Sequence, residues 1–233
     1  MEKNSAVIKP VAHIYTDFKE KFGIPRQSGL SPSSRGKIVF EPEYRNPDAI
    51  RGIDGFSHLW LIFDFSECHT DGCSLTVRPP RLGGNTRVGV FASRSPFRPN
   101  SLGLSSVRLV GAEKTEADGI VLWVAGADLL DGTPIYDIKP YIPYSDCHTD
   151  AAGGYAAKHE SHRLKIEIPP QILEAIAADK RAALVECLES DPRPSYIDDE
   201  TRVYSMRFAD YDIHFRVTGE TLTVVGADCR AQR

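Results

Sequence analysis

Short β-rich runs separated by loops fill about the first 140 residues of the chain, and no long helical periodicity crosses them. Each run is bounded by Gly, Pro, Asn or Asp, which is typical of strands. The connecting loops are unusually rich in proline and glycine, and residues 116–119 have the composition of a hairpin turn. This pattern predicts a mostly β fold for the first part of the chain. The β-rich runs are residues 6–14, 57–65, 87–92, 107–110 and 120–124.

The composition changes after residue 150. A small, polar stretch at 151–162 is typical of a connector. Apolar residues at the helical period then follow Pro169 and Pro170 and predict one helix that ends at Asp191, because the residue before a proline is disfavoured in a helix. The strands predicted beyond it are residues 203–208, 213–217 and 222–225. We therefore expect a mostly β domain at 1–150, a connector at 151–164 and a small α+β domain at 165–233.

Charge is unevenly distributed along the chain. The 233 residues carry a net charge of −4, yet residues 72–112 contain six arginines and no Asp, Glu or Lys, so the rest of the chain carries −10. Guanidinium groups form planar, bidentate hydrogen bonds with phosphates and carboxylates. We therefore expect an anion-binding surface in this segment.

Other features exclude several classes of protein. With 41% hydrophobic residues the composition is that of an ordinary globular protein. No apolar run approaches the roughly 18 residues that cross a bilayer, and the first ten residues lack the apolar stretch of a signal peptide. We expect a cytoplasmic protein without a membrane segment.

Cysteine chemistry and the common nucleotide-binding motifs give little support to other functions. The five cysteines form no CxxC pair, and the spacing of Cys68, His69, Cys73, Cys147 and His148 matches no usual zinc pattern, so we expect no metal. The motifs GxGxxG, GxxxxGK[ST], HExxH and GxSxG are absent, which disfavours a doubly wound nucleotide-binding fold.

Polar residues are concentrated instead in three loops, at 25–27, 93–100 and 128–134. These loops contain Arg, Asn, Gln and Asp next to proline and glycine. Such groups suit a polar, zwitterionic small molecule, with Arg for a carboxylate and Asp for an ammonium group or ribose hydroxyls.

The same loops form part of a longer series of motifs that resembles one family. The motifs are FGIPRQ at 22–27, RGIDGFSHLW at 51–60, TVRPPRLGGN at 76–85, GVFASRSPFRPN at 89–100, DLLDGTP at 128–134, DIKPY at 137–141 and DPRPSY at 191–196. In this order they are similar to those of the TsaA-like tRNA (adenine(37)-N6)-methyltransferases.

This resemblance implies an S-adenosylmethionine-dependent methyltransferase domain built as a β-barrel, with a small C-terminal domain and a homodimer. It implies methylation of N6 of threonylcarbamoyl-adenosine at position 37, in the anticodon loop of tRNA. Three alternatives remain open: an RNA-binding protein that keeps the cofactor pocket, another enzyme that cleaves S-adenosylmethionine, and a metal-dependent hydrolase.

The resemblance also implies a set of cofactor-binding residues. They are Pro25, Arg26, Gln27, Ser66, Glu67, Arg94, Leu104, Asp128, Leu130, Asp131, Gly132 and Thr133. The chain departs from the family at Ser66 and Glu67, where many relatives have His-Gln-like residues.

The reaction and the RNA suggest further candidates. N6 must lose a proton as it is methylated, and Asp128, Asp131 and Tyr141 are possible acceptors by residue type; nothing in the sequence chooses between them. The arginines between Arg78 and Arg98 are expected to contact phosphates. The DPRPSY segment is expected to contact the anticodon stem-loop or the rim of the active site. The RNA-binding candidates are Arg78, Arg81, Arg87, Arg98, Arg193 and Tyr196.

Overall fold

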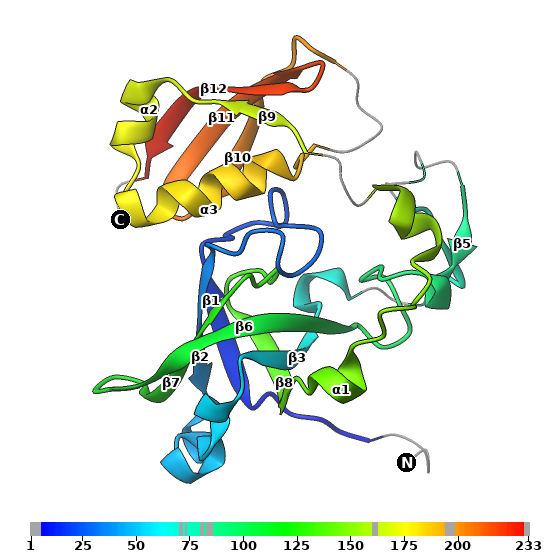
Figure 1. Ribbon diagram of the computed structural model, residues 1–233, viewed down its shortest axis with the longest axis vertical. Helices are drawn as coiled ribbons and strands as arrows, with labels where there is room; N and C mark the ends of the chain where they lie inside the picture. Colours follow the sequence, from blue (N-terminus) through cyan, green and yellow to red (C-terminus); the bar gives the residue numbers. More distant parts are fainter. Residues whose placement is uncertain are drawn as a thin grey trace.

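The computed structural model describes residues 6–69, 72, 74–79, 82, 86–159, 163–193 and 199–230. Figure 1 shows a barrel of strands with a smaller unit of strands and two helices beside it. Each unit has its own hydrophobic core.

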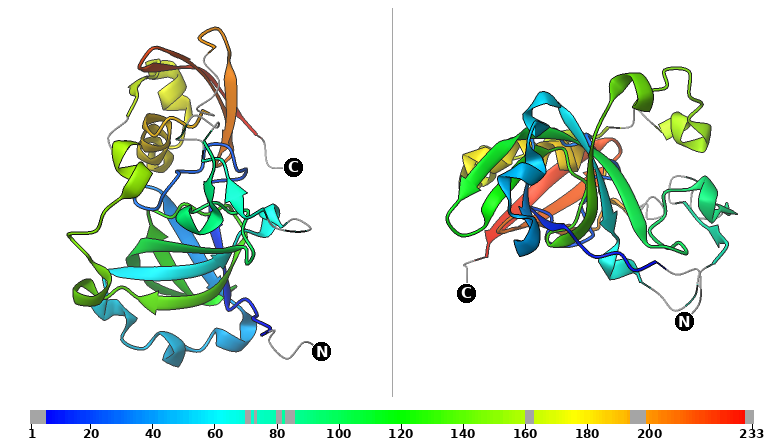
Figure 2. Two further views of the ribbon diagram at one scale, coloured as in Figure 1. Left: turned by 90° about the vertical axis from the view of Figure 1, so that its right-hand side faces the viewer. Right: turned by 90° about the horizontal axis from the view of Figure 1, so that it is seen from below.

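Six antiparallel strands close the barrel. Their order around it is β1 (Ala12–Thr16), β2 (Arg35–Phe40), β7 (Gly119–Ala125), β6 (Leu102–Thr115), β3 (His58–Asp64) and β8 (Thr133–Pro140). Buried and exposed side chains alternate along β1, as they do in a strand with one face on a core. Ile14, Ile38, Leu61 and Leu122 are fully buried inside, and the strands surround this interior when the molecule is seen from below (Figure 2, right). The predicted mostly β fold with a β-barrel is confirmed.

Short elements connect the barrel strands. The turn predicted at 116–119 is confirmed, since Thr115 and Gly119 pair across the hairpin of β6 and β7. The strand predicted at 6–14 begins only at Ala12, and the run at 87–92 forms two strand residues followed by a 3-10 turn. The remaining elements before residue 160 are β4 (Thr76–Val77), β5 (Val88–Gly89), α1 (Pro143–Asp146) and the 3-10 helices η1 (Pro42–Tyr44), η2 (Pro47–Ile50), η3 (Ile53–Gly55), η4 (Ser66–Cys68), η6 (Val90–Ala92) and η7 (Gly154–His159).

The C-terminal unit is a four-stranded sheet covered by two helices. Its strand order is β10 (Tyr204–Phe208), β11 (Tyr211–Thr218), β12 (Thr221–Cys229) and β9 (Lys165–Glu167), and only β9 lies parallel to its neighbour. The three strands predicted after residue 200 match β10, β11 and β12, whereas β9 was not predicted. The helix α3 (Ala178–Glu189) buries Leu184 and Leu188 in the core of this unit.

The prediction of one continuous helix before Asp191 is wrong. The structure has α2 (Pro170–Ala175) and α3, separated by Ile176 and Ala177 in an extended conformation. Neither residue is a helix breaker, so tertiary contacts account for the break. Ile176 is buried in the core, and the Ala177 N–H donates to the Tyr211 hydroxyl at 3.0 Å.

The 17–34 loop, which connects β1 to β2, joins the two units. Phe18 lies in the core of the C-terminal unit, where its ring contacts Phe208 edge-on, and the two residues form a β-bridge. Phe22 and Ile24 pack against the same core. In Figure 1 this loop rises from the barrel toward α3.

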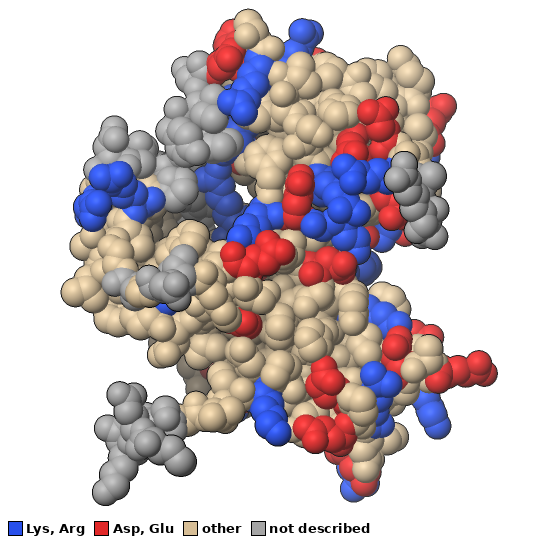
Figure 3. All heavy atoms as spheres, turned by 180° about the vertical axis from the view of Figure 1, so that it is seen from behind, with Lys and Arg blue, Asp and Glu red and all other residues tan. Residues whose placement is uncertain are grey.

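Polar contacts reinforce this junction. The Lys180 Nζ donates to both oxygens of Asp17 at 2.9 and 2.8 Å. Glu186 accepts hydrogen bonds from the hydroxyls of Ser31 and Ser33 at 3.0 and 2.7 Å. Basic and acidic side chains accordingly lie side by side on the rear face where the units meet (Figure 3).

Candidate cofactor and RNA site

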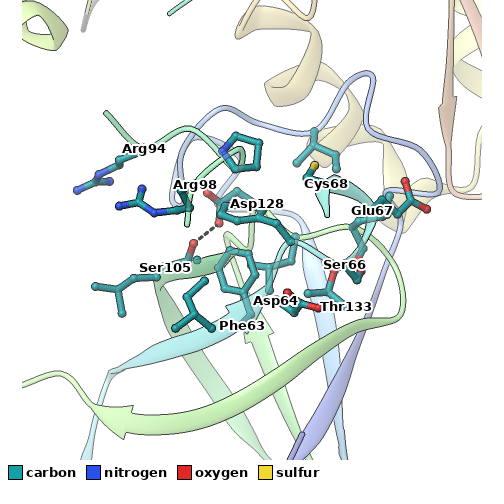
Figure 4. Close-up of a pocket in the computed structure, with 18 of the residues that line it drawn as sticks. Phe63, Asp64, Ser66, Glu67, Cys68, Arg94, Arg98, Ser105, Asp128 and Thr133 are labelled. Carbon is teal, nitrogen blue, oxygen red and sulfur yellow. Dashed lines mark hydrogen bonds between the residues drawn. The ribbon is translucent and has the colours of Figure 1, made fainter. Parts of the chain in front are cut away.

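A pocket of about 960 Å³ lies at the rim of the barrel that faces the C-terminal unit (Figure 4). Loops far apart in the sequence line it: the 17–34 loop, the end of β3 with η4, the 91–100 segment, the start of β6 and the 128–133 turn. Figure 4 shows Arg94 and Arg98 on one side, Ser66, Glu67 and Thr133 on the other, and Asp128 between them.

Most of the residues that the resemblance assigns to the cofactor converge on this pocket. Those that line it are Pro25, Arg26, Gln27, Ser66, Glu67, Arg94, Leu104, Asp128, Leu130 and Thr133. Asp131 and Gly132 are not among the lining residues. For all twelve residues that the resemblance assigns to the cofactor, binding of the cofactor stays a prediction.

Asp128 is the half-buried carboxylate of the pocket. The Ser105 hydroxyl donates to its Oδ1 at 2.6 Å (Figure 4). Loss of water raises the pKa of Asp128, although the Ser105 hydrogen bond and the positive charge of Arg94 oppose this shift. A carboxylate with a raised pKa is a stronger proton acceptor than an ordinary one.

Asp131, three residues later, has different surroundings. Its Oδ1 accepts from the Thr16 backbone N–H at 2.8 Å, and its Oδ2 lies 2.8 Å from the Lys19 Nζ. Gly132 has a φ of +76°, which favours glycine, and its N–H donates to the carbonyl of Ile14. Both residues therefore hold the turn to the barrel frame, and a catalytic role for Asp131 stays a prediction.

Tyr141 follows β8 on the outer side of the barrel. Its ring lies 5.5 Å from that of Trp60, and its N–H donates to the carbonyl of His58. Burial raises the pKa of Tyr141, and the nearby Cys147 and Asp146 add to the shift. Trp60 lines the pocket and Tyr141 does not.

Two hydrogen-bonded contacts link the loops around the pocket. A guanidinium nitrogen of Arg94 donates to the Gln27 side-chain oxygen. The Arg26 guanidinium contacts the C-terminal unit, because one of its nitrogens donates to the backbone carbonyls of Arg193 and Asp191 at 2.8 and 3.3 Å.

The predicted RNA-binding residues fall into separate groups. Arg78 and Arg87 are exposed beside the short strands β4 and β5, and Arg87 donates to the Thr76 hydroxyl at 2.9 Å. Arg98 lines the pocket, and Arg193 forms an ion pair with Asp191. The remaining two candidates, Arg81 and Tyr196, lie outside the described residues.

Sequence reasoning missed a polar cluster at the end of β3. Asp64 is only 8% exposed, lines the pocket and lies 2.8 Å from the Nε2 of His69. Burial raises the pKa of Tyr136, and the charge of Asp64 and a hydrogen bond to it contribute. An aspartate closing the apolar run HLWLIFD was the available signal, since a charge there needs partners.

The structure also bears on metals and membranes. Within the described ranges, no three His, Cys, Asp or Glu side chains gather closely enough to hold a metal ion; Cys73 lies outside those ranges. The helices in the same part of the chain are too short or too polar to span a bilayer.

Comparison with known proteins gives the class and then the family. Residues 13–147 match the tRNA-methyltransferase O N-terminal domain, and residues 161–228 match the TrmO C-terminal domain. These matches place the chain among the tRNA methyltransferases. The chain belongs to the tRNA-methyltransferase O family, as the sequence motifs predicted.

Individual relatives agree over nearly the whole chain. The tRNA (adenine(37)-N6)-methyltransferase of Escherichia coli K12 is 37% identical, with 97% of this chain and 100% of the relative covered. A Pseudomonas aeruginosa protein that carries S-adenosylmethionine-dependent methyltransferase in its name, RcsF, is 40% identical over 89% and 91% of the two chains. The crystal structure of TrmO from P. aeruginosa superposes with a TM-score of 0.80 at 34% identity, covering 98% of this chain and 99% of the other.

Proposed function

We propose that this protein uses S-adenosylmethionine to methylate N6 of threonylcarbamoyl-adenosine at position 37 of tRNA. The main support is the convergence of the 25–27, 66–67, 93–100 and 128–133 segments on one rim pocket. Its volume of about 960 Å³ suits a cofactor of this size together with part of a substrate, since ligand pockets span roughly 300–1,000 Å³.

The lining residues suit the chemical groups of this cofactor. Arg94 or Arg98 would bind its carboxylate, and Leu104 with Leu130 would contact its apolar parts. Lys21 lies beside the departure at Ser66 and Glu67, where its Nζ donates to the Glu67 carbonyl at 2.6 Å and lies 3.6 Å from the carboxylate. This contact partly neutralises the extra carboxylate that the chain places next to the pocket.

The cofactor supplies an activated methyl group, and the protein aligns the acceptor nitrogen with it and accepts one proton. Of the three acceptor candidates, only Asp128 lines the pocket. Ser105 donates to one of its oxygens and so orients the carboxylate. We therefore assign proton acceptance to Asp128, because its raised pKa makes it a stronger base at neutral pH.

The RNA would approach over the arginine-rich segment. Base 37 lies in a single-stranded loop, so turning it toward the pocket costs only stacking, on the order of a few kcal/mol. Arg78 and Arg87 are exposed and suited to phosphates, and Arg98 at the pocket is suited to a phosphate or to the substrate carboxylate.

A homodimer and a cytoplasmic location complete the proposal. Phe91 and Leu102 line the pocket and are 78% and 37% exposed, and exposed apolar side chains of this kind favour a partner surface. A tRNA substrate is consistent with the cytoplasm. Sedimentation equilibrium should give twice the mass of the chain, and a monomer at micromolar concentration would contradict the dimer.

The experiment compares two arginine variants. Titration calorimetry should detect binding of S-adenosylmethionine to the unaltered protein, and nucleoside mass spectrometry should detect the methylated base in treated tRNA. Arg94→Ala should lower kcat/KM by at least tenfold, because it removes a pocket charge and the contact with Gln27. Arg216→Ala is the matched control, since Arg216 is exposed on β11, lies outside the arginine-rich segment and does not line the pocket. Equal activity of both variants, or tRNA binding without methylation, would refute the proposal.

A further inference from the structure

The segment that carries Pro25, Arg26 and Gln27 is held from the C-terminal unit. The residues before it, Phe18 and Phe22, pack into the core of that unit rather than the barrel core. The position of this side of the pocket therefore depends on a unit none of whose described residues lines the pocket.

The DPR turn, defined here as Asp191, Pro192 and Arg193, is itself built rigidly. The Arg193 guanidinium donates from two nitrogens to the two carboxylate oxygens of Asp191, at 2.9 and 3.0 Å, and both side chains are 16% exposed. Asp191 has a φ of +50°, which non-glycine residues rarely adopt. Burial alone would raise the pKa of Asp191, but the hydrogen bonds and charge of Arg193, with the charge of Arg26, lower it overall.

Arg26 connects this turn to the pocket. Its guanidinium donates to the backbone carbonyls of Asp191 and Arg193. The paired hydrogen bonds between the side chains of these two residues, called here the Asp191–Arg193 fork, hold that backbone in place. The side-chain oxygen of the next residue, Gln27, accepts a hydrogen bond from Arg94 of the 91–100 segment. A continuous series of contacts thus runs from the DPR turn through Arg26 and Gln27 to Arg94.

We propose that the Asp191–Arg193 fork is a positioning element of the cofactor site, which acts through Arg26 to hold the 25–27 segment against the pocket. The inference rests on the proposed function and deepens it. Because the DPR turn is also the proposed contact with RNA, binding of the anticodon stem-loop and binding of the cofactor become coupled. Such a coupling is reciprocal, so each ligand changes the affinity of the other by the same factor.

The test measures S-adenosylmethionine binding without RNA by titration calorimetry on the full chain. Asp191→Asn keeps the side-chain size, and asparagine tolerates the left-handed backbone conformation. The substitution removes the negative charge that pairs with the Arg193 guanidinium. We expect the Kd to rise about tenfold for Asp191→Asn and for Arg193→Ala. Arg193→Lys should fail to restore affinity, since an ammonium group cannot form the fork. Arg163→Ala is the control, because it removes an Arg–carboxylate pair of 2.7 Å, to Glu189, that is separate from the DPR turn.

Circular dichroism and thermal unfolding show whether each variant is folded. If Asp191→Asn and Arg193→Ala are not folded, the binding measurement is made on Arg193→Gln instead. At saturating RNA the KM for S-adenosylmethionine should rise while kcat stays within about twofold, as expected for a lost positioning contact. With S-adenosylhomocysteine bound, the affinity for an anticodon stem-loop should change by the same factor that the stem-loop imposes on the cofactor, and Asp191→Asn should abolish both changes.

The failures of the two proposals are distinguishable. If the unaltered protein binds no S-adenosylmethionine, the proposed function fails. If it binds, and folded Asp191→Asn and Arg193→Ala proteins bind equally well, the positioning role of the DPR turn is refuted.

Discussion

Two aspartates three residues apart show how far surroundings decide the behaviour of one residue type. Asp128 faces the pocket with Ser105 as a hydrogen-bond donor, and loss of water raises its pKa. Asp131 is held at the rim by Thr16 and Lys19. Identical carboxyl groups thus become a candidate base and a structural support.

The raised pKa of Asp128 predicts that the stability difference between the unaltered protein and Asp128→Asn depends on pH. Because its pKa in the folded protein is raised above the ordinary 3.8, the folded state binds the proton more tightly than the unfolded state does. Its contribution to the free energy of unfolding is therefore full below pH 3.8 and is lost as the pH rises through the raised pKa. Asp128→Asn does not titrate, so its stability relative to the unaltered protein should increase from pH 4.5 to pH 8. Urea unfolding at several pH values measures this, and a constant difference would contradict it.

The different burial of the cysteines predicts that their thiols differ in reactivity. Cys187 is 1% exposed, and burial raises its pKa to about 12, whereas Cys147 and Cys229 are exposed. The thiolate is the reactive form. Iodoacetamide at pH 8 should therefore label Cys147 and Cys229 within minutes and Cys187 only after urea is added, as measured by peptide mass spectrometry. Rapid labelling of Cys187 in the folded protein would show that α3 is not packed as described.

At the scale of elements, β3 and β6 form the wall that joins barrel and pocket. Gly103 of β6 pairs with Phe63 of β3, and both line the pocket. A Cβ at Gly103 would lie 2.2 Å from the Phe63 ring. The absence of a side chain at this position therefore lets the ring close the mouth of the barrel.

Gly103→Ala should displace the Phe63 ring. We expect a loss of about 1–3 kcal/mol in the free energy of unfolding, as for other overpacked cores, and weaker cofactor binding. Gly111→Ala on the same strand is the matched control, since nothing lies within 4 Å of its Cβ position. Urea unfolding and titration calorimetry on both variants would decide the matter, and similar behaviour of the two would contradict the role of the ring.

At the scale of the whole molecule, the two units share the 17–34 loop. By chain order this loop belongs to the barrel, but Phe18 is 2% exposed in the other core. The domain limits 1–150, 151–164 and 165–233 stay a prediction from the sequence. In the structure, the 17–34 loop packs the first of these segments against the last. Insertion of a barrel loop into the core of the other unit favours unfolding as one cooperative unit.

Phe18→Ala tests this cooperativity. The unaltered protein should show one calorimetric transition, and the variant should lose about 3–5 kcal/mol, as expected when a buried phenylalanine is truncated. Because the loss falls on the C-terminal core, the variant's transition should broaden or split. Phe56→Ala is the control, since Phe56 is 39% exposed. Two separate transitions in the unaltered protein would refute the single unit.

The local parts of the fold were predictable because their causes are local. Alternating side chains and turn residues define the hairpin of β6 and β7 and the strands after residue 200. The break between α2 and α3 was not predictable, since a contact with the distant Tyr211 accompanies it. β2 and β8 were missed because glycine or proline and charged residues interrupt their apolar positions.

The sequence by itself determined the mostly β class, the family and the loops that carry polar side chains, because residue type and order are sufficient for these. Only the tertiary structure decided that Asp128 faces the pocket while Asp131 does not, and that Arg26 contacts the DPR turn. Closure of the barrel and insertion of Phe18 into the other core set the distances between remote segments. Such distances depend on the packing of the whole chain, so spacing along the sequence does not contain them.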